Sequence, residues 1–336
     1  MENLSLPKYG RPFIAAGVAI TVWGVAGLIQ MPHWGQGGYY TDATSTVTRV
    51  QESGPAEEAG LEVGDRVITI AGVPAEGLPM QSRRPLPEPG ESHTVVVERD
   101  GETVSTELVY GALSQDQQVA RIVIAVVNVA FIGFGLWAFF TVNTSNAMLF
   151  AMFGLAMGLA SFEGPHLGSW EGVAWLVALS SGIFCFMLLL HLFLSFPKTK
   201  KVLHSRMTTR AMYGAVVAFV AFGIAELLLH PLLYTAQAFV ALVLASVTLI
   251  LALAALLHSW FKSTRSERRD SGFALIPLGI AIALAPYLLQ LLVRVAASGF
   301  NLPGYDYYAL LEVAIPVTMA LAVVKHARFV SLQQAG

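Results

Sequence analysis

Long apolar runs, separated by short polar or basic segments, follow one another along most of the chain. A helix needs about 20 mostly apolar residues to cross the roughly 30 Å of hydrocarbon in a bilayer. Eight windows meet that requirement. They cover residues 12–31, 119–141, 146–162, 172–196, 211–230, 236–260, 273–297 and 307–324. The pattern predicts an α-helical integral membrane bundle of about eight transmembrane helices.

The pattern changes between the first and the second window. Runs of β-branched residues there, such as VITI at 67–70 and TVVVE at 94–98, are typical of short strands. Asp100-Gly101 separates two alternating runs and predicts a hairpin with a type I′ turn. Pro55 suits the first turn of a short helix, and Gly60 suits its left-handed C-terminal cap. We therefore expect a small β-rich domain inserted between the first two helices.

One stretch of this inserted domain carries a long, ordered motif. From Val47 to Gly72 the chain reads VTRVQESGPAEEAGLEVGDRVITIAG, which is a strand, then G-x-A-x-x-A-G-L, then a strand that follows Gly-Asp. This text closely resembles a PDZ domain. The resemblance implies a small PDZ-like β-sandwich, capped by helices, between transmembrane helices 1 and 2.

The resemblance also implies a site for a peptide or a protein C-terminus. Ligands of that family add a strand beside a β-strand, and their terminal carboxylate sits on backbone N–H groups of a glycine-rich loop. The text GGYY stands in the place of the loop, and residues 44–50 stand in the place of the strand. The candidate peptide-binding residues are Gly37, Gly38, Tyr39, Tyr40, Thr46 and Thr48.

The second wall of such a groove is less clear in the sequence. It should lie within residues 77–90, which read GLPMQSRRPLPEPG. Proline inside a helix costs about 3 kcal/mol, so only a short helix around 79–84 fits this text. Two possibilities stay open: a groove that binds peptides, or a PDZ-like domain that packs on the bundle or on a partner and binds no free terminus.

Basic residues indicate the orientation. Lys and Arg gather in the connections 197–210 and 261–272 and are missing from the connections near 163–171, 231–235 and 298–306. Cytoplasmic loops carry this excess of positive charge, so we expect a bacterial cytoplasmic (inner) membrane protein with both termini cytoplasmic and the PDZ-like domain outside. No A-x-A cleavage signal follows the first span, which we interpret as a retained anchor.

Four segments follow from this organisation. They are residues 1–31 (cytoplasmic N-terminus and transmembrane helix 1), 32–117 (extracytoplasmic PDZ-like domain), 118–326 (seven-helix transmembrane bundle) and 327–336 (cytoplasmic tail).

Composition narrows the function further. Hydrophobic residues make up 55% of the chain and charged residues 12%, which excludes a disordered protein. The single cysteine, Cys185, excludes a disulfide scaffold. No basic stripe with interleaved aromatic residues exists, so nucleic acid is not an expected partner. We expect membrane lipids to be partners of the apolar helices.

Recognisable catalytic motifs are missing from the sequence. H-E-x-x-H, G-x-S-x-G and the Walker loop do not occur. We expect no enzyme activity, no catalytic residue, no metal and no cofactor.

Ionisable residues at the outer ends of the predicted spans are the remaining chemical signal, because such groups are costly in hydrocarbon. This outer polar cluster consists of Glu163, His166, Glu226, His230, Arg294 and Glu312. It fits a ligand pocket, a metal site from the Glu and His residues, a proton-sensing site, or a structural ion pair such as Arg294 with Glu312 or Glu226.

The whole layout resembles the sensor region of PDZ-containing bacterial histidine kinases of the competence pheromone receptor type. HLFLSFPK, residues 191–198, is similar to a motif of such multi-span sensors. The kinase domains themselves are missing from this chain, so we expect a stand-alone module or a truncated relative.

The resemblance implies a non-enzymatic receptor or signalling module. It would bind a peptide, lipid or protein partner outside and couple it through the bundle to a cytoplasmic partner such as a kinase. A membrane enzyme (a protease or a lipid-modifying enzyme) that uses the outer polar cluster, or a transporter, remain alternatives.

Overall fold

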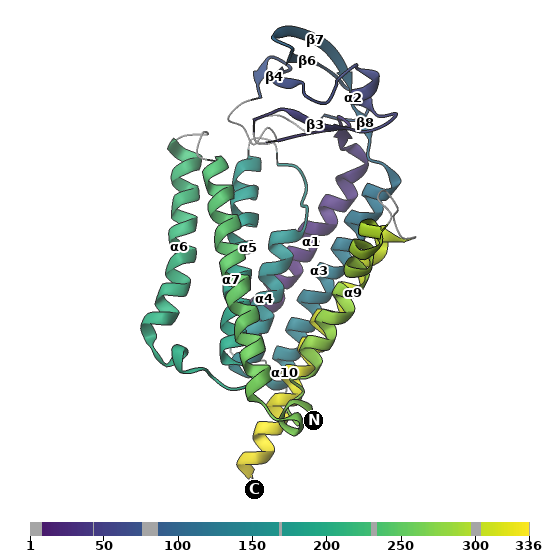
Figure 1. Ribbon diagram of the computed structural model, residues 1–336. Coiled ribbons are helices and arrows are strands. Elements are labelled where there is room, and N and C mark those ends of the chain that lie inside the picture. The colour runs from purple at the N-terminus through teal and green to yellow at the C-terminus, as the bar shows by residue number, and fades with distance from the viewer. Residues whose placement is uncertain are drawn as a thin grey trace.

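A helical bundle carries a small β-rich domain at one of its ends (Figure 1). The computed structural model describes residues 9–42, 44–75, 87–167, 170–229, 234–296 and 304–335. The bundle helices are α1 (Gly10–Gln30), α3 (Gln115–Val142), α4 (Ser145–Ser161), α5 (Glu171–Ser195), α6 (Arg206–Leu229), α7 (Tyr234–Lys262), α9 (Leu275–Ala296) and α10 (Ala314–Ala335).

Seven helices within the described ranges are long and apolar enough to cross a membrane. These helices indicate a membrane protein, as predicted, but the predicted count of eight is not confirmed. The window at 146–162 forms α4, which has 17 residues and is therefore only about 25 Å long. The helix ends at Ser161 because Phe162 adopts an extended conformation, and Pro165 disfavours helix at Gly164 a little further on.

The last predicted window also begins differently. Residues Tyr305–Val313 form a 3-10 helix, η6, and the α-helix begins only at Ala314. Pro316, which the sequence placed inside a span, lies in the first turn of α10, where its missing N–H costs no helical hydrogen bond.

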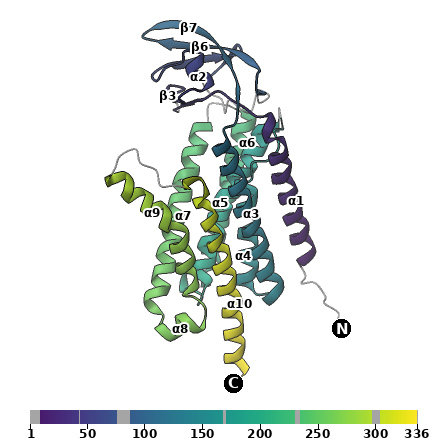
Figure 2. The same ribbon diagram turned by 90° about the vertical axis from the view of Figure 1, so that its right-hand side faces the viewer.

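Small residues let neighbouring helices approach closely. A Cβ on Gly135 of α3 would lie 3.1 Å from the Cα atom of Ala151 in α4, and a Cβ on Gly154 would overlap the carbonyl oxygen of Phe131. Glycines at such positions allow backbones to pack in direct contact. Figure 2 shows α3 and α4 side by side in this arrangement.

The two ends of the bundle differ. The β-rich domain lies at one end, which we call the PDZ end. The start of α1, the short helix α8 (Arg265–Asp270) and the end of α10 lie at the opposite end (Figures 1 and 2).

Short strands and one short helix build the inserted domain. They are β1 (Gly35–Gln36), β2 (Tyr39–Thr41), β3 (Val47–Val50), α2 (Pro55–Glu58), β4 (Arg66–Ile70), β5 (Val73–Pro74), β6 (Ser92–Arg99), β7 (Glu102–Val109) and β8 (Gly111–Ala112). A four-stranded sheet has the order β5-β4-β6-β7, and two further pairs join β2 to β3 and β1 to β8.

Three local predictions for this domain are confirmed. The turn between β6 and β7 has φ of 53° at Asp100 and 84° at Gly101, as a type I′ turn requires. Helix α2 begins at Pro55, and Gly60 has φ of 76°. The predicted short helix around 79–84 falls in residues 76–86, which lie outside the described part of the chain.

The domain has a hydrophobic core of its own, built from α2 and the strands. Beside it, the carboxylate of Asp65 is 1% exposed and accepts two hydrogen bonds of 2.7 Å, from Nε and Nη2 of Arg99. These bonds hold the pKa of Asp65 below its ordinary value. Arg99 also donates to the Gly60 carbonyl at 2.8 Å, so the hairpin is tied to the turn that follows α2.

The domain is attached to the bundle by two connections that lie side by side. The chain enters it from α1 through β1 and leaves it into α3 through β8, and these two strands pair with each other at Gly35↔Ala112. Helix α3 then begins with a capping box between Ser114 and Gln117. The pairing holds the domain directly above α1 and α3.

Gly60→Val is expected to destabilise the inserted domain by about 1–2 kcal/mol, because the left-handed conformation at Gly60 is unfavourable for a residue with a Cβ atom. A Cβ at this position would meet no heavy atom within 4 Å, so the cost is backbone strain alone. Urea unfolding of the fragment 32–117, followed by circular dichroism, measures it. Gly60→Asn is the control, since asparagine tolerates this conformation. Equal stability of the valine variant and the unchanged fragment would contradict the assignment.

Candidate functional site

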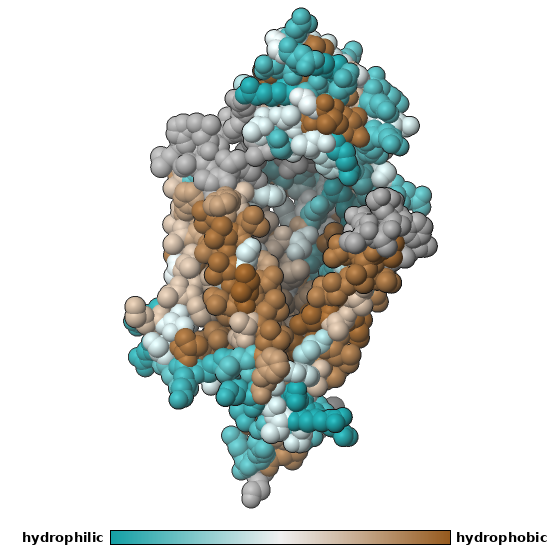
Figure 3. Space-filling view, in the orientation of Figure 1, coloured by the Kyte–Doolittle hydropathy of each residue, from teal (hydrophilic) through white to brown (hydrophobic). Residues whose placement is uncertain are grey.

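A cavity of about 940 Å³ lies between the inserted domain and the PDZ end of the bundle. Figure 3 shows the surface hollowed beneath the polar domain, between the apolar flanks of α7 and α9. The cavity is lined by Trp23 of α1, residues 34–40, Gln117 and Arg121 of α3, residues 159–167, and the first turns of α5. Its walls therefore come from both parts of the protein.

The predicted carboxylate loop forms one wall. Gly37, Gly38, Tyr39 and Tyr40 all line the cavity. Gly38 has φ of 73°, and its carbonyl accepts a hydrogen bond of 2.8 Å from Gln51 N–H. The sequence thus identified a segment that faces a cavity large enough for a ligand.

Thr46 and Thr48, the other two candidates for peptide binding, are not among the residues that line this cavity. Thr46 bridges to Arg66 of β4, and Thr48 lies in β3, where its hydroxyl donates to the Tyr40 carbonyl at 3.2 Å. Strand β3 pairs with β2 along one edge, while its first residues bond to the β4 side. Tyr39 and Tyr40 of β2 therefore line the cavity, whereas no residue of the segment 44–50 does, and the role of Thr46 and Thr48 in peptide binding stays a prediction.

The opposite wall is the extended segment 162–167, which follows α4 and packs tightly on α1. A Cβ on Gly24 would overlap the ring of Phe162, and a Cβ on Gly27 would overlap the carbonyl oxygen of Glu163. Gly164 likewise lies under the ring of Trp23. Gly24 and Gly27 of α1, together with Gly164 of the segment, thus leave room for irregular backbone to pack against α1.

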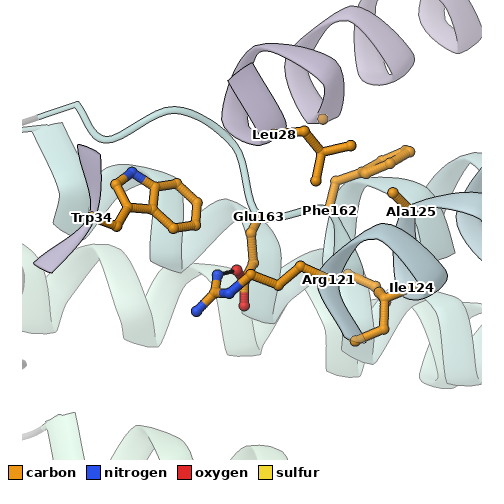
Figure 4. Close-up of a pocket in the computed structure, with 9 residues that line it drawn as sticks. Leu28, Trp34, Arg121, Ile124, Ala125, Phe162 and Glu163 are labelled. Carbon is orange, nitrogen blue, oxygen red and sulfur yellow. Dashed lines mark ion pairs between the residues drawn. The ribbon is translucent and has the colours of Figure 1, made fainter. Parts of the chain in front are cut away.

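Arg121, Glu163 and Trp34 meet where α3, the segment 162–167 and the start of the inserted domain come together (Figure 4). The guanidinium of Arg121 forms an ion pair with the Glu163 carboxylate. Its central carbon also lies 4.8 Å from the centre of the Trp34 ring, a cation–π distance. The Arg121 side chain is 28% exposed, whereas the Glu163 side chain is 56% exposed.

His166 takes part in a second polar cluster of the cavity wall. Its Nδ1 lies 3.0 Å from Oε2 of Glu171, the first residue of α5. Its backbone N–H donates to Oε1 of Gln30 at 2.6 Å, which ties the segment to the end of α1. Glu163 and His166 therefore share one cavity with the carboxylate loop.

Glu226 and Glu312 of the outer polar cluster do not line this cavity. Glu226 lies in α6, where it is 5% exposed, and its carboxylate oxygens have no hydrogen-bond partner among the described residues. Glu312 lies in η6 and accepts a hydrogen bond of 2.8 Å from the Tyr287 hydroxyl of α9. His230 and the side chain of Arg294 lie outside the described residues, so the Arg294–Glu312 ion pair stays a prediction.

Within the described ranges, no three His, Cys, Asp or Glu residues are placed to hold a metal ion. Glu163 pairs with Arg121, and His166 pairs with Glu171, so the two carboxylates at the cavity already have basic partners. The arrangement is suited to binding a ligand by charge and hydrogen bonding.

Arg121 and Trp34 are the site residues that the sequence analysis missed. Arg121 is the one charged residue in the predicted window 119–141, and an ionisable residue within a span is a signal for function. Its position near the end of the window made it resemble a boundary residue. Trp34 carried no local signal, because its role depends on where α3 lies.

Gly27→Ala is expected to destabilise the protein by about 1–3 kcal/mol, because the new Cβ forces the Glu163 backbone away from α1. Thermal unfolding in detergent, followed by tryptophan fluorescence, measures the change. Gly133→Ala in α3 is the control: a Cβ there meets nothing within 4 Å, and alanine favours the helix, so stability should stay the same or rise. Unchanged stability of Gly27→Ala would contradict the close packing.

Comparison with known proteins gives one match. Residues 46–99 match the family described as PDZ domain. No curated protein and no solved structure matches the chain. The similarity of the whole layout to histidine kinase sensors therefore stays a prediction. The protein carries a PDZ domain at residues 46–99 and a set of helices able to span a membrane.

Proposed function

We propose that this protein is a non-enzymatic membrane receptor or accessory module whose PDZ domain receives the C-terminus of a peptide or protein. One observation supports this most directly: the segment Gly37–Tyr40 lines a cavity whose other walls belong to the bundle. PDZ domains are modules that bind extended peptides by adding a strand to a sheet. A ligand in this cavity contacts both the PDZ domain and the bundle.

The architecture of the cavity supports a peptide as the ligand. Strand β2 continues directly from the glycine-rich segment and belongs to a two-stranded sheet with β3. An added strand would extend that sheet, with its carboxylate toward the backbone of Gly37 and Gly38. The cavity volume of about 940 Å³ lies within the usual size range of ligand sites.

We further propose that the PDZ domain lies outside a bacterial inner membrane, with both chain ends in the cytoplasm. Basic residues support this orientation, because Arg265, Arg268 and Arg269 belong to α8, which lies at the opposite end of the bundle (Figure 2). Lys198 and Lys201 lie in the connection between α5 and α6. In this arrangement α4 and the extended segment 162–167 together form an eighth crossing. The opposite end would meet the cytoplasmic signalling partner, a kinase being the candidate that the resemblance suggests.

Binding of free C-termini is the first test of this function. Purified full-length protein in detergent is expected to bind a pool of hexapeptides with free carboxylates, randomised at their last four positions, and to bind the same pool only weakly when amidated. Tyr40→Asp places a negative charge on the cavity wall and should weaken binding of the free pool by about tenfold.

Thr103→Asp is the matched control, because it adds the same charge on exposed β7, away from the cavity, and should leave binding unchanged. Equal binding of free and amidated pools would instead favour a PDZ domain that packs on the bundle and binds no terminus.

Orientation is tested by labelling with a membrane-impermeant thiol reagent. Ser105→Cys, on exposed β7 of the PDZ domain, should react in intact cells, whereas Ser266→Cys in α8 should react only after permeabilisation. The native Cys185 is buried and should not react. Labelling of both positions from outside would contradict the proposed orientation.

A further inference from the structure

We infer that Glu163 is a built-in competitor for the ligand's carboxylate: the bound C-terminus replaces Glu163 on Arg121, and the release of Glu163 loosens the segment 162–167 from α3. The inference rests on the proposed function, since it names the counter-charge of the same ligand and the way in which binding reaches the bundle.

Arg121 is the first step of the argument. Among the described residues that line the cavity, it is the only Lys or Arg. Its side chain is mostly buried and holds its guanidinium beside the Trp34 ring, one residue before β1. A guanidinium binds a carboxylate through two parallel hydrogen bonds. The terminal carboxylate of a peptide beside Gly37 and Gly38 therefore shares its cavity with one strong cation.

Glu163 is the second step. Its carboxylate, the same chemical group as the C-terminus of the ligand, is paired with the Arg121 guanidinium, and the Glu163 side chain is 56% exposed. Because more than half of the Glu163 side chain is exposed, water can solvate its carboxylate when it leaves Arg121, which lowers the free-energy cost of the exchange. A ligand whose carboxylate is also held by backbone N–H groups can displace Glu163, while Arg121 keeps one anionic partner throughout.

The third step links this exchange to the helices. Glu163 belongs to the segment 162–167, which joins α4 to α5 and lies against α1 at Gly27. Its ion pair with Arg121 ties this segment to α3, beside the packing of Phe162 against Ala125 and Ile132 of the same helix. Loss of the ion pair leaves the segment without a polar tie to α3, while its bonds to Gln30 of α1 and Glu171 of α5 remain. Ligand binding at the PDZ domain thus changes how α3 is held relative to α4 and α5.

Two substitutions test the exchange, because it predicts effects of opposite sign. Arg121→Gln should raise the Kd of the free-carboxylate hexapeptide pool by about tenfold or more, toward that of the amidated pool. Glu163→Gln removes the competitor and should lower the Kd of the free pool by about two- to fivefold. Arg66→Gln, which removes one positive charge from the PDZ domain outside the cavity, is the control and should change Kd by less than twofold.

Arg121→Lys covers the case in which Arg121→Gln fails to fold. It keeps the charge but cannot form two parallel hydrogen bonds, so its Kd should lie between those of the unchanged protein and the glutamine variant. Hydrogen exchange gives a readout that a purely structural ion pair would not move. Amides of residues 163, 164, 166 and 167 should exchange faster when the free pool is added, and in Glu163→Gln they should exchange fast without it.

The results separate the two proposals. Carboxylate-dependent binding that Tyr40→Asp weakens, combined with Arg121 and Glu163 variants that leave Kd within twofold or shift it in the same direction, overturns the exchange and leaves the receptor function standing. Equal binding of the free and amidated pools overturns both. Opposite shifts of Kd together with faster exchange in the segment 162–167 support the inference.

Discussion

The close contact between α1 and the backbone of residues 162–164 determines much of this architecture. Helix α4 is too short to reach the PDZ end, so extended chain must complete the path to α5. Irregular backbone at membrane depth is tolerated only where protein buries it or where it lines a cavity. Gly24 and Gly27 provide that burial, because only glycines leave room for Phe162 and the Glu163 carbonyl. The same contact directs the Glu163 side chain toward Arg121.

Strand pairing between its two connections positions the PDZ domain on the bundle. Pairing of β1 with β8 brings its two connections together above α1 and α3. The connection from α1 carries Trp34 and then Gly37–Tyr40, while α3 carries Arg121. The glycine-rich segment of the PDZ domain and the guanidinium of the bundle therefore line the same cavity. Neither the domain nor the bundle forms this site alone.

The features that the sequence predicted correctly depend on short-range chemistry. The Asp100-Gly101 turn, the helix start at Pro55 and the left-handed Gly60 each follow from residues within a few positions of one another. The apolar helices were equally visible, because hydropathy is a local property of the chain. The segment Gly37–Tyr40, whose role in binding stays a prediction, was singled out through the order of elements in a known family.

The features that the sequence analysis missed depend on distant parts of the chain. The ion pair of Arg121 with Glu163 joins α3 to the segment between α4 and α5, and no local sequence pattern predicts it. The pairing of β2 with β3 likewise joins separate parts of the chain, and the peptide-binding role of Thr46 and Thr48 stays a prediction. Likewise, the window at 146–162 was apolar enough for a span, but its helix ends at Ser161 after only 17 residues.

The β1–β8 pair has a consequence for how such a protein can change over time. Because the chain enters and leaves the domain at neighbouring points, the spacing of α1 and α3 does not depend on what lies between them. Domains whose ends lie close together are the ones that tolerate insertion and exchange. A different recognition domain can therefore replace the PDZ domain without a change in the bundle, provided that its two ends also pair as short strands.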